Sequence, residues 1–96
     1  MERRRVVVTG MGAVTPVGLN APESWNAVRA GTCGIAPITQ YDPAGMKVQL
    51  AAEVKGFQPD ELFGKAEARR MGRFTQFALA AAREALAHSG FQVENA

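Results

Sequence analysis

The sequence has little of what marks an exported or membrane protein. Among its 96 residues Cys33 is the only cysteine, which rules out an internal disulfide framework and suits a reducing compartment. No stretch approaches the roughly 18 apolar residues of a membrane-spanning helix. The basic start at Arg3 to Arg5 is followed by only three apolar residues before Thr9, so no signal peptide is recognisable. We expect a cytoplasmic protein that does not bind a membrane.

Strong charge and clusters of reactive side chains are also missing. The net charge of +2 is too small to indicate a nucleic-acid partner. One cysteine and one histidine, Cys33 and His88, are too few for a metal site, and the sequence offers Ser24 and Ser89 no acid–base partner. Cys33 is expected to be a small loop residue, and His88 to sit in the last turn of a helix, where the dipole favours it. We therefore expect no catalytic group, cofactor site or metal ligand within this chain.

A glycine-rich turn follows the first apolar run, in the stretch VVVTGMGAVTPVG at residues 6–18. A dinucleotide-binding loop needs glycine at its first, third and sixth positions, directly before a helix. Those positions hold Gly10, Gly12 and Thr15 here, and Pro16 disfavours helix at Thr15. No Gly-Lys-Ser/Thr of a phosphate loop occurs anywhere. The two glycines instead predict a close crossing of two backbones.

The hydrophobic pattern predicts four elements in a small α/β unit. They are a buried strand over 4–11, a short helix over 22–30, a half-solvated strand over 47–55 and a long helix over 66–89 that Gly72 favours dividing. A loop is expected over 31–46. In the second strand, one face is predicted to carry Val48, Leu50, Ala52 and Val54.

The long helix has an apolar stripe, which is more typical of a core than of a cofactor or acyl pocket. The stripe comprises Met71, Phe74, Ala78, Ala81, Ala82, Ala85 and Leu86, with Arg69, Arg73, Gln76, Arg83 and Glu84 on the opposite face. Its many alanines imply a neighbour packed at close range, and Trp25 is expected to anchor the short helix to a sheet. These faces demand more covering surface than 96 residues hold, and a further strand is expected after the helix. We therefore expect one piece of a larger layered α/β structure.

Four ordered blocks carry a resemblance to a known family: RRVVVTGMGAVTPVG, ESWNAVRAGTCGI, LAAEVKGF and EARRMGRFTQFALAAAREAL. In this order they resemble the opening of the β-ketoacyl-acyl-carrier-protein synthases, of the ketosynthase II type in the thiolase-like superfamily. The resemblance implies an α/β, partial thiolase-like fold, the N-terminal piece of a layered αβαβα architecture. Residues 1–96 would then form an incomplete N-terminal ketosynthase domain.

The resemblance also implies a reaction, the decarboxylative Claisen condensation that elongates acyl chains in fatty acid biosynthesis. The implied partner is acyl carrier protein, which brings the phosphopantetheine arm, so that no separate cofactor is needed; the full-length parent would be a homodimer. The family's nucleophilic cysteine and two histidines lie beyond residue 96, so this chain alone is expected to be inactive, with exposed apolar surface. Two alternatives stay open: a polyketide-type ketosynthase or its chain-length partner, and a non-catalytic module that binds carrier protein or self-associates.

The resemblance points to a docking surface for the carrier protein at Lys65, Arg69 and Arg70. Arg69 and Arg70 match the family's basic pair, whereas Lys65 is offset by one position and Arg73 has no clear counterpart. Charge complementarity would accelerate encounter with an acidic partner and fix its orientation. The plainer interpretation is a solvated helix face, and Arg3 to Arg5 are expected to be solvated charges flanking a strand.

Overall fold

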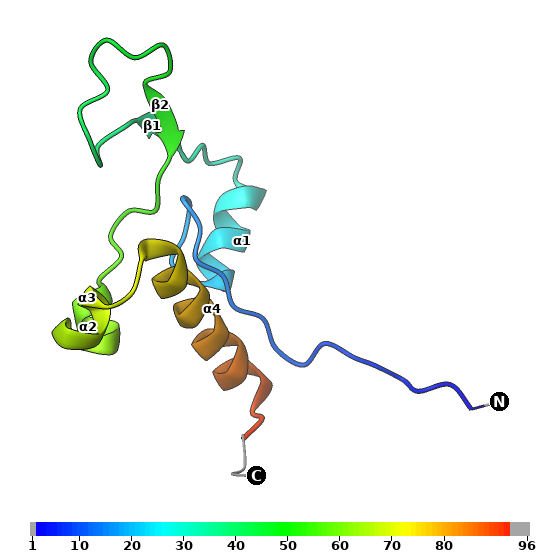
Figure 1. The fold of residues 1–96 in the computed structure, drawn as a ribbon. Coiled ribbons are helices and arrows are strands. Elements are labelled where there is room, and N and C mark those ends of the chain that lie inside the picture. Colours follow the sequence, from blue (N-terminus) through cyan, green and yellow to red (C-terminus); the bar gives the residue numbers. More distant parts are fainter. Residues whose placement is uncertain (1, 93–96) are drawn as a thin grey trace.

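The computed structural model describes residues 2–92 and shows four helices and a two-stranded sheet within that range (Figure 1). In chain order the elements are α1 (Ala21–Arg29), β1 (Ile35–Pro37), β2 (Leu50–Ala52), α2 (Pro59–Phe63), α3 (Lys65–Arg69) and α4 (Arg73–Ser89). The strand expected after the last helix falls largely on residues 93–96, outside the described residues.

Helix α1 confirms the short helix predicted over 22–30. The side chain of Asn20 caps it by accepting the Glu23 N–H at 2.9 Å, and Pro22 lies in the first turn, where its missing N–H costs nothing. The helix ends at Arg29, two residues before Gly31, whose φ of +75° suits a glycine.

The long helix is divided at Gly72, as its sequence favours. Helix α3 stops at Arg69 and α4 begins at Arg73, with Gly72 extended between them at φ −69° and ψ 161°. Gly90 ends α4 in the left-handed region, at φ +70°. Helix α2 was not predicted, because its five residues are too few to show a helical period.

The strand predicted over residues 4–11 is wrong for this chain. The segment is extended but pairs with no strand among the described residues, and Figure 1 shows its first part running away from the helices. Val6 is 91% exposed and Val8 81%. A strand is defined by its ladder of hydrogen bonds to a neighbour, and no described segment supplies one.

The second predicted strand, over 47–55, is shortened to β2 and pairs antiparallel with β1, which lies inside the stretch predicted as a loop. Ala36 faces Ala51 in this pair. The predicted inward face is reversed, because Leu50 is 55% exposed while Ala51 is partly covered. The hairpin projects from the helices, so no core lies beside it to select the Leu50 face (Figure 1).

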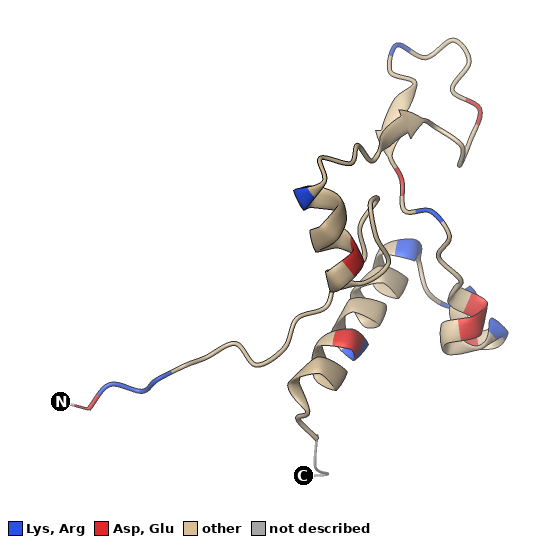
Figure 2. Ribbon diagram, turned by 180° about the vertical axis from the view of Figure 1, so that it is seen from behind, with Lys and Arg blue, Asp and Glu red and all other residues tan. Residues whose placement is uncertain are grey.

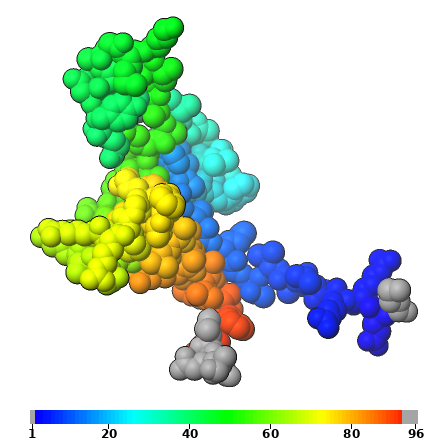
Figure 3. Space-filling view, in the orientation of Figure 1, coloured from blue at the N-terminus to red at the C-terminus, as the bar shows by residue number. Residues whose placement is uncertain are grey.

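Helix α4 is the centre of the molecule, with residues 10–21 along one side and residues 54–71 along another (Figures 1 and 3). Among the described residues only Ala68, Ser24 and Gln76 are buried. The radius of gyration is 17.2 Å, against about 12.5 Å for a compact chain of this length. The chain thus surrounds one helix without closing a core of its own.

Two aromatic residues predicted to be covered are exposed. Trp25 is 61% exposed and therefore does not anchor α1 to a sheet in the described structure. Phe74, placed in the apolar stripe, is 80% exposed at the start of α4. The elements that would cover both side chains are absent from the described part of the chain.

Candidate functional site

The residues proposed to dock a partner all lie on α3 or at its end. Lys65 and Arg69 are one helical turn apart, which places them on the same side of α3. Arg70 follows at the C-cap, and its guanidinium lies 3.7 Å from the Glu67 carboxylate with both side chains largely exposed. All three basic residues are exposed to solvent.

The short helices α2 and α3 carry balanced charge (Figure 2). Three basic residues, Lys65, Arg69 and Arg70, stand against three acidic ones, Asp60, Glu61 and Glu67. Net attraction of an acidic partner by this helix pair is therefore weak. Any docking here depends on which side of the pair faces the partner.

Two arginines of α4, predicted to lie opposite its apolar stripe, also hold the segment before it. Arg73 donates to the Val54 carbonyl at 2.9 Å and stacks 4.9 Å from the centre of the Phe77 ring. Arg83 donates to the Leu62 carbonyl at 2.7 Å and stacks 4.7 Å from the centre of the Phe63 ring. Both arginines remain exposed while they make these contacts, so their place opposite the stripe is confirmed, whereas the bonds themselves were not predicted.

Gln76 was also predicted to lie opposite the apolar stripe, but unlike the two arginines it is buried. It is only 7% exposed, and its Nε2 donates to the Ala68 carbonyl at 2.9 Å and to the Met71 carbonyl at 3.4 Å. Both acceptors lie where α3 ends, and the Ala68 carbonyl also accepts the Met71 N–H at 3.2 Å. The buried Gln76 amide is thus hydrogen-bonded, and so are the two carbonyls that it contacts.

On another side of α4, the close crossing predicted from Gly10 and Gly12 is confirmed. A Cβ atom on Gly12 would overlap the carbonyl oxygen of Ala81 and lie 2.8 Å from its carbonyl carbon. One on Gly10 would overlap the Ala85 oxygen and lie 2.7 Å from the Ser89 nitrogen. Ala81 and Ala85 of α4 are therefore the close neighbours of these glycines, which joins two features that the sequence predicted separately.

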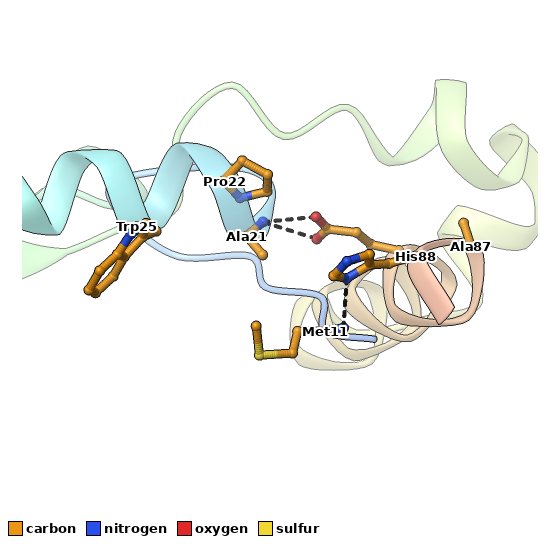
Figure 4. A pocket seen from close by; sticks show the side chains of 7 residues that line it. Met11, Ala21, Pro22, Trp25, Ala87 and His88 are labelled. Carbon is orange, nitrogen blue, oxygen red and sulfur yellow. Dashed lines mark hydrogen bonds between the residues drawn. The ribbon is translucent and has the colours of Figure 1, made fainter. Parts of the chain in front are cut away.

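Glu84 and His88 fasten the same segment by hydrogen bonds that the sequence did not reveal (Figure 4). The Glu84 carboxylate accepts the Ala13 N–H at 2.9 Å and the Ala21 N–H at 2.9 and 3.1 Å. Because Ala21 begins α1, this negative charge also lies at the positive end of a helix dipole. His88, in the last turn as predicted, accepts the Met11 N–H at Nδ1 over 3.1 Å. The only feature of the sequence that could have pointed to these bonds is the spacing of Glu84 and His88, which lie one helical turn apart.

A groove of about 900 Å³ opens beside these bonds, between α1 and the end of α4 (Figure 4). Its walls include Met11, Pro22, Trp25 and Ala87, and are mainly apolar. The polar side chains at its edge, Glu84 and His88, are already engaged with backbone amides. The groove therefore presents apolar surface without a reactive group.

The remaining candidates for chemistry have structural surroundings. Cys33 is exposed in the loop before β1, as expected, and its thiol faces the Ile35 carbonyl at 3.8 Å. Ser24, in α1, is buried, and its Oγ lies 2.8 Å from the Oγ of Thr15, which belongs to the turn before that helix. Within residues 2–92 no three His, Cys, Asp or Glu side chains gather as metal ligands. No helix in this range is long and apolar enough to cross a membrane.

Comparisons with known proteins match this chain over almost its whole length. The family described as "Beta-ketoacyl synthase, N-terminal domain" matches residues 3–96. Proteins named 3-oxoacyl-[acyl-carrier-protein] synthase 2 are 41% identical over 97% of the chain in Coxiella burnetii, 44% over 100% in Vibrio cholerae and 46% over 88% in Staphylococcus aureus. The chain spans 22%, 24% and 20% of those relatives.

A solved structure shares the fold. It is titled "The ishigamide ketosynthase/chain length factor" and superposes with a TM-score of 0.84 at 38% identity, covering 95% of this chain and 23% of that one. Together with the family match, this superposition confirms the expected fold class, a part of the α/β, thiolase-like fold.

Proposed function

The chain belongs to the β-ketoacyl synthase family, in its N-terminal domain, and from this premise we propose that it forms the opening segment of an enzyme that elongates acyl chains on acyl carrier protein. The observation that carries the proposal is 41–46% identity, over nearly the whole chain, to proteins named 3-oxoacyl-[acyl-carrier-protein] synthase 2. The names of these relatives support acyl carrier protein as the partner and fatty acid biosynthesis as the setting.

The proposed reaction joins two thioesters with loss of carbon dioxide. A cysteine thiolate takes the acyl group from one carrier protein, releasing the carrier's thiol. Malonyl-carrier protein then loses carbon dioxide, and its carbanion attacks the acyl thioester, which expels the thiolate and leaves a 3-oxoacyl chain two carbons longer. We assign the nucleophile and its histidines to the protein's other segments, since residues 2–92 bring no such group together.

The proposal needs no resident cofactor, because the phosphopantetheine arm would arrive on the carrier protein. A cytoplasmic location is supported by the single cysteine, which suits a reducing compartment. Assembly of the full-length enzyme as a homodimer follows from the family resemblance. The extensive exposed apolar surface of the described residues is consistent with further contacts of this kind.

The direct test is a condensation assay with the full-length protein, acyl-carrier protein and malonyl-carrier protein. Formation of 3-oxoacyl-carrier protein, detected by mass, is the result that we expect. A protein that is folded and yet releases neither this product nor carbon dioxide would contradict the proposal.

We assign the contact with the carrier protein to Lys65, Arg69 and Arg70. Their exposure leaves them free to meet an acidic surface, and Lys65 and Arg69 share one side of α3. A cation in the first turn of a helix is repelled by the positive end of the helix dipole, so the position of Lys65 does not stabilise α3. An external acidic partner would supply the favourable interaction that the helix does not.

Charge reversal of the basic pair tests this assignment. In the full-length protein, Arg69→Glu with Arg70→Glu should lower the second-order rate of acyl transfer from carrier protein by about tenfold or more at low salt, because attraction becomes repulsion. Added salt should then raise the rate, because it screens the repulsion, whereas it lowers the rate of the wild type. Arg29→Glu, a reversal at the exposed end of α1, is the control. Equal rates for the double variant and the control would remove the assignment.

A second candidate is a subunit of a polyketide-type ketosynthase, either the condensing one or its chain-length partner. The structural match to a ketosynthase/chain length factor at 38% identity favours keeping it. The same condensation assay separates the two subunits, since a chain-length partner would condense nothing by itself.

A further inference from the structure

The helix pair α2–α3 is held to α4 by side chains. The two short helices pack against each other, whereas among the described elements neither has a comparable backbone contact with α4. The polar contacts that join them to α4 include the bond from Arg83 to the Leu62 carbonyl and the bonds from Gln76 to the Ala68 and Met71 carbonyls. These contacts help to fix the orientation of the pair.

Arg83 bonds the end of α2, and Gln76 bonds the end of α3. They are two helical turns apart and lie on one face of α4. Arg83 reaches the end of α2, where it also stacks on the Phe63 ring at 4.7 Å, and Gln76 reaches the end of α3. Two attachment points restrict the rotation of the pair more than either one alone.

These contacts are specific to the residues that make them. The Gln76 amide donates to both the Ala68 and the Met71 carbonyls where α3 ends, and a methionine of similar size could donate to neither. The planar guanidinium of Arg83 can donate in its plane while its face lies on an aromatic ring, which a lysine ammonium cannot do in the same way.

Orientation matters here because the charge of α2–α3 is balanced. One side carries Lys65 and Arg69, while α2 presents Asp60 and Glu61. A rotation of the pair would bring acidic side chains toward an acidic partner in place of basic ones. Correct docking thus requires a fixed pair more than it requires added positive charge.

We propose that Arg83 and Gln76 are positioning residues for carrier-protein docking: they do not touch the partner but fix α2–α3 so that Lys65 and Arg69 face it. The proposal rests on the proposed function, because it presumes that an acidic carrier protein docks on α3. It goes beyond that function by assigning a role to two side chains of α4 that carry no docking contact.

The test compares Arg83→Met, Arg83→Lys and Gln76→Met in the full-length protein with the control Arg29→Met. Each variant is assayed with acyl-carrier protein and with a small acyl thioester that lacks the protein. Loss of positioning should raise KM for acyl-carrier protein by about threefold to tenfold. The KM and kcat for the small thioester should equal those of the wild type. Arg83→Lys keeps the charge but loses the stacked, planar contact, so it should stay impaired, and Arg29→Met should behave as the wild type.

Salt dependence separates positioning from direct contact. Since Arg83 does not meet the partner, Arg83→Met should leave the slope of log(kcat/KM) against log salt close to the wild type, unlike reversal of Arg69 and Arg70. Hydrogen exchange of the amides in residues 59–70 should accelerate in the same variant. This second readout needs no activity and holds for any variant that folds.

Three results would overturn the proposal: an unchanged KM for acyl-carrier protein, an equal loss with both substrates, or unchanged exchange in residues 59–70. Failure of the proposed function gives a different pattern, in which the wild type itself shows no preference for acyl-carrier protein over the small thioester. Arg83→Met would then still accelerate exchange in α2–α3, without any kinetic consequence.

Discussion

At the scale of single residues, Gly12 meets the tightest limit in the structure. Its Cα faces the backbone of Ala81 so closely that a Cβ atom would overlap the carbonyl oxygen. Gly12 does not have a positive φ, so its requirement is space and not backbone conformation. The backbone crossing leaves no flexible side chain that could move aside.

Gly12→Ala should destabilise the full-length protein by about 2 kcal/mol or more, because overpacking against backbone forces elements apart. Urea unfolding measures the loss. Gly72→Ala is the matched control, since its new Cβ would lie 3.1 Å from the edge of the exposed Phe74 ring, which can turn away. Equal effects of the two substitutions would contradict the crossing.

Glu84 is the polar counterpart of this crossing, because one carboxylate accepts amides from both Ala13 and Ala21. Glu84→Leu should cost about 2–4 kcal/mol of stability, since hydrogen bonds to a charged acceptor are lost and the amides remain partly buried. Glu61→Leu, an exposed position on α2, serves as the control. Accelerated exchange of the Ala13 and Ala21 amides should accompany the loss, and unaltered exchange would refute the role.

At the scale of elements, the β1–β2 hairpin is closed by Glu53. Its carboxylate accepts the Thr39 N–H at 2.9 Å, the Thr39 hydroxyl at 2.9 Å and the Gln40 N–H at 3.1 Å. The Thr39 amide, above all, lowers the pKa of Glu53 from its ordinary value of 4.5, while desolvation opposes the shift and Gln40, the Thr39 hydroxyl and Lys55 add to it.

The lowered pKa gives a sign for the pH dependence of the hairpin. Closure by Glu53 is fully present above pH 4.5, the ordinary value, and is lost as the pH falls through the lower pKa of the folded state. An NMR titration of the Thr39 and Gln40 amides should show both shifting together below that pH. In Glu53→Gln the two amides should no longer titrate, and persistence of the transition there would assign it to another group.

The sequence predicted the helices better than the strands, for a physical reason. Caps and breaks are local, so Pro22, Gly72 and Gly90 marked the ends of α1, α3 and α4. Strands depend on distant partners, and residues 4–11 find none among the described residues. The hairpin side that faces inward likewise depends on a neighbouring layer that is absent from the described part of the chain.

The same distinction holds for the candidate site. The exposure of Lys65, Arg69 and Arg70 could be predicted because exposure is the default for charged side chains, whereas their docking role came from the family resemblance and stays a prediction. The contacts of Gln76 and Arg83 could not be predicted, since helical spacing placed both only opposite the apolar stripe. Only the path of residues 54–71 brings carbonyls to meet them.

At the scale of the whole molecule, the chain leaves far more surface open than a closed domain does. Its accessible surface is 7955 Å², against about 5300 Å² for a compact monomer of this mass. Much of the excess is apolar, including Val6, Trp25 and Phe74. In a chain that spans 20–24% of its relatives, such faces fit the proposal that further segments of the enzyme cover them.

The most direct test of the enzyme proposal is the intact mass of the protein purified from its source, before and after incubation with acyl-carrier protein. We expect an initial mass well above the 10.2 kDa of this chain. After incubation it should rise by one acyl group, held as a thioester that hydroxylamine removes. A protein of 10.2 kDa, or a larger one whose mass does not change, would contradict the assignment to an acyl-elongating enzyme.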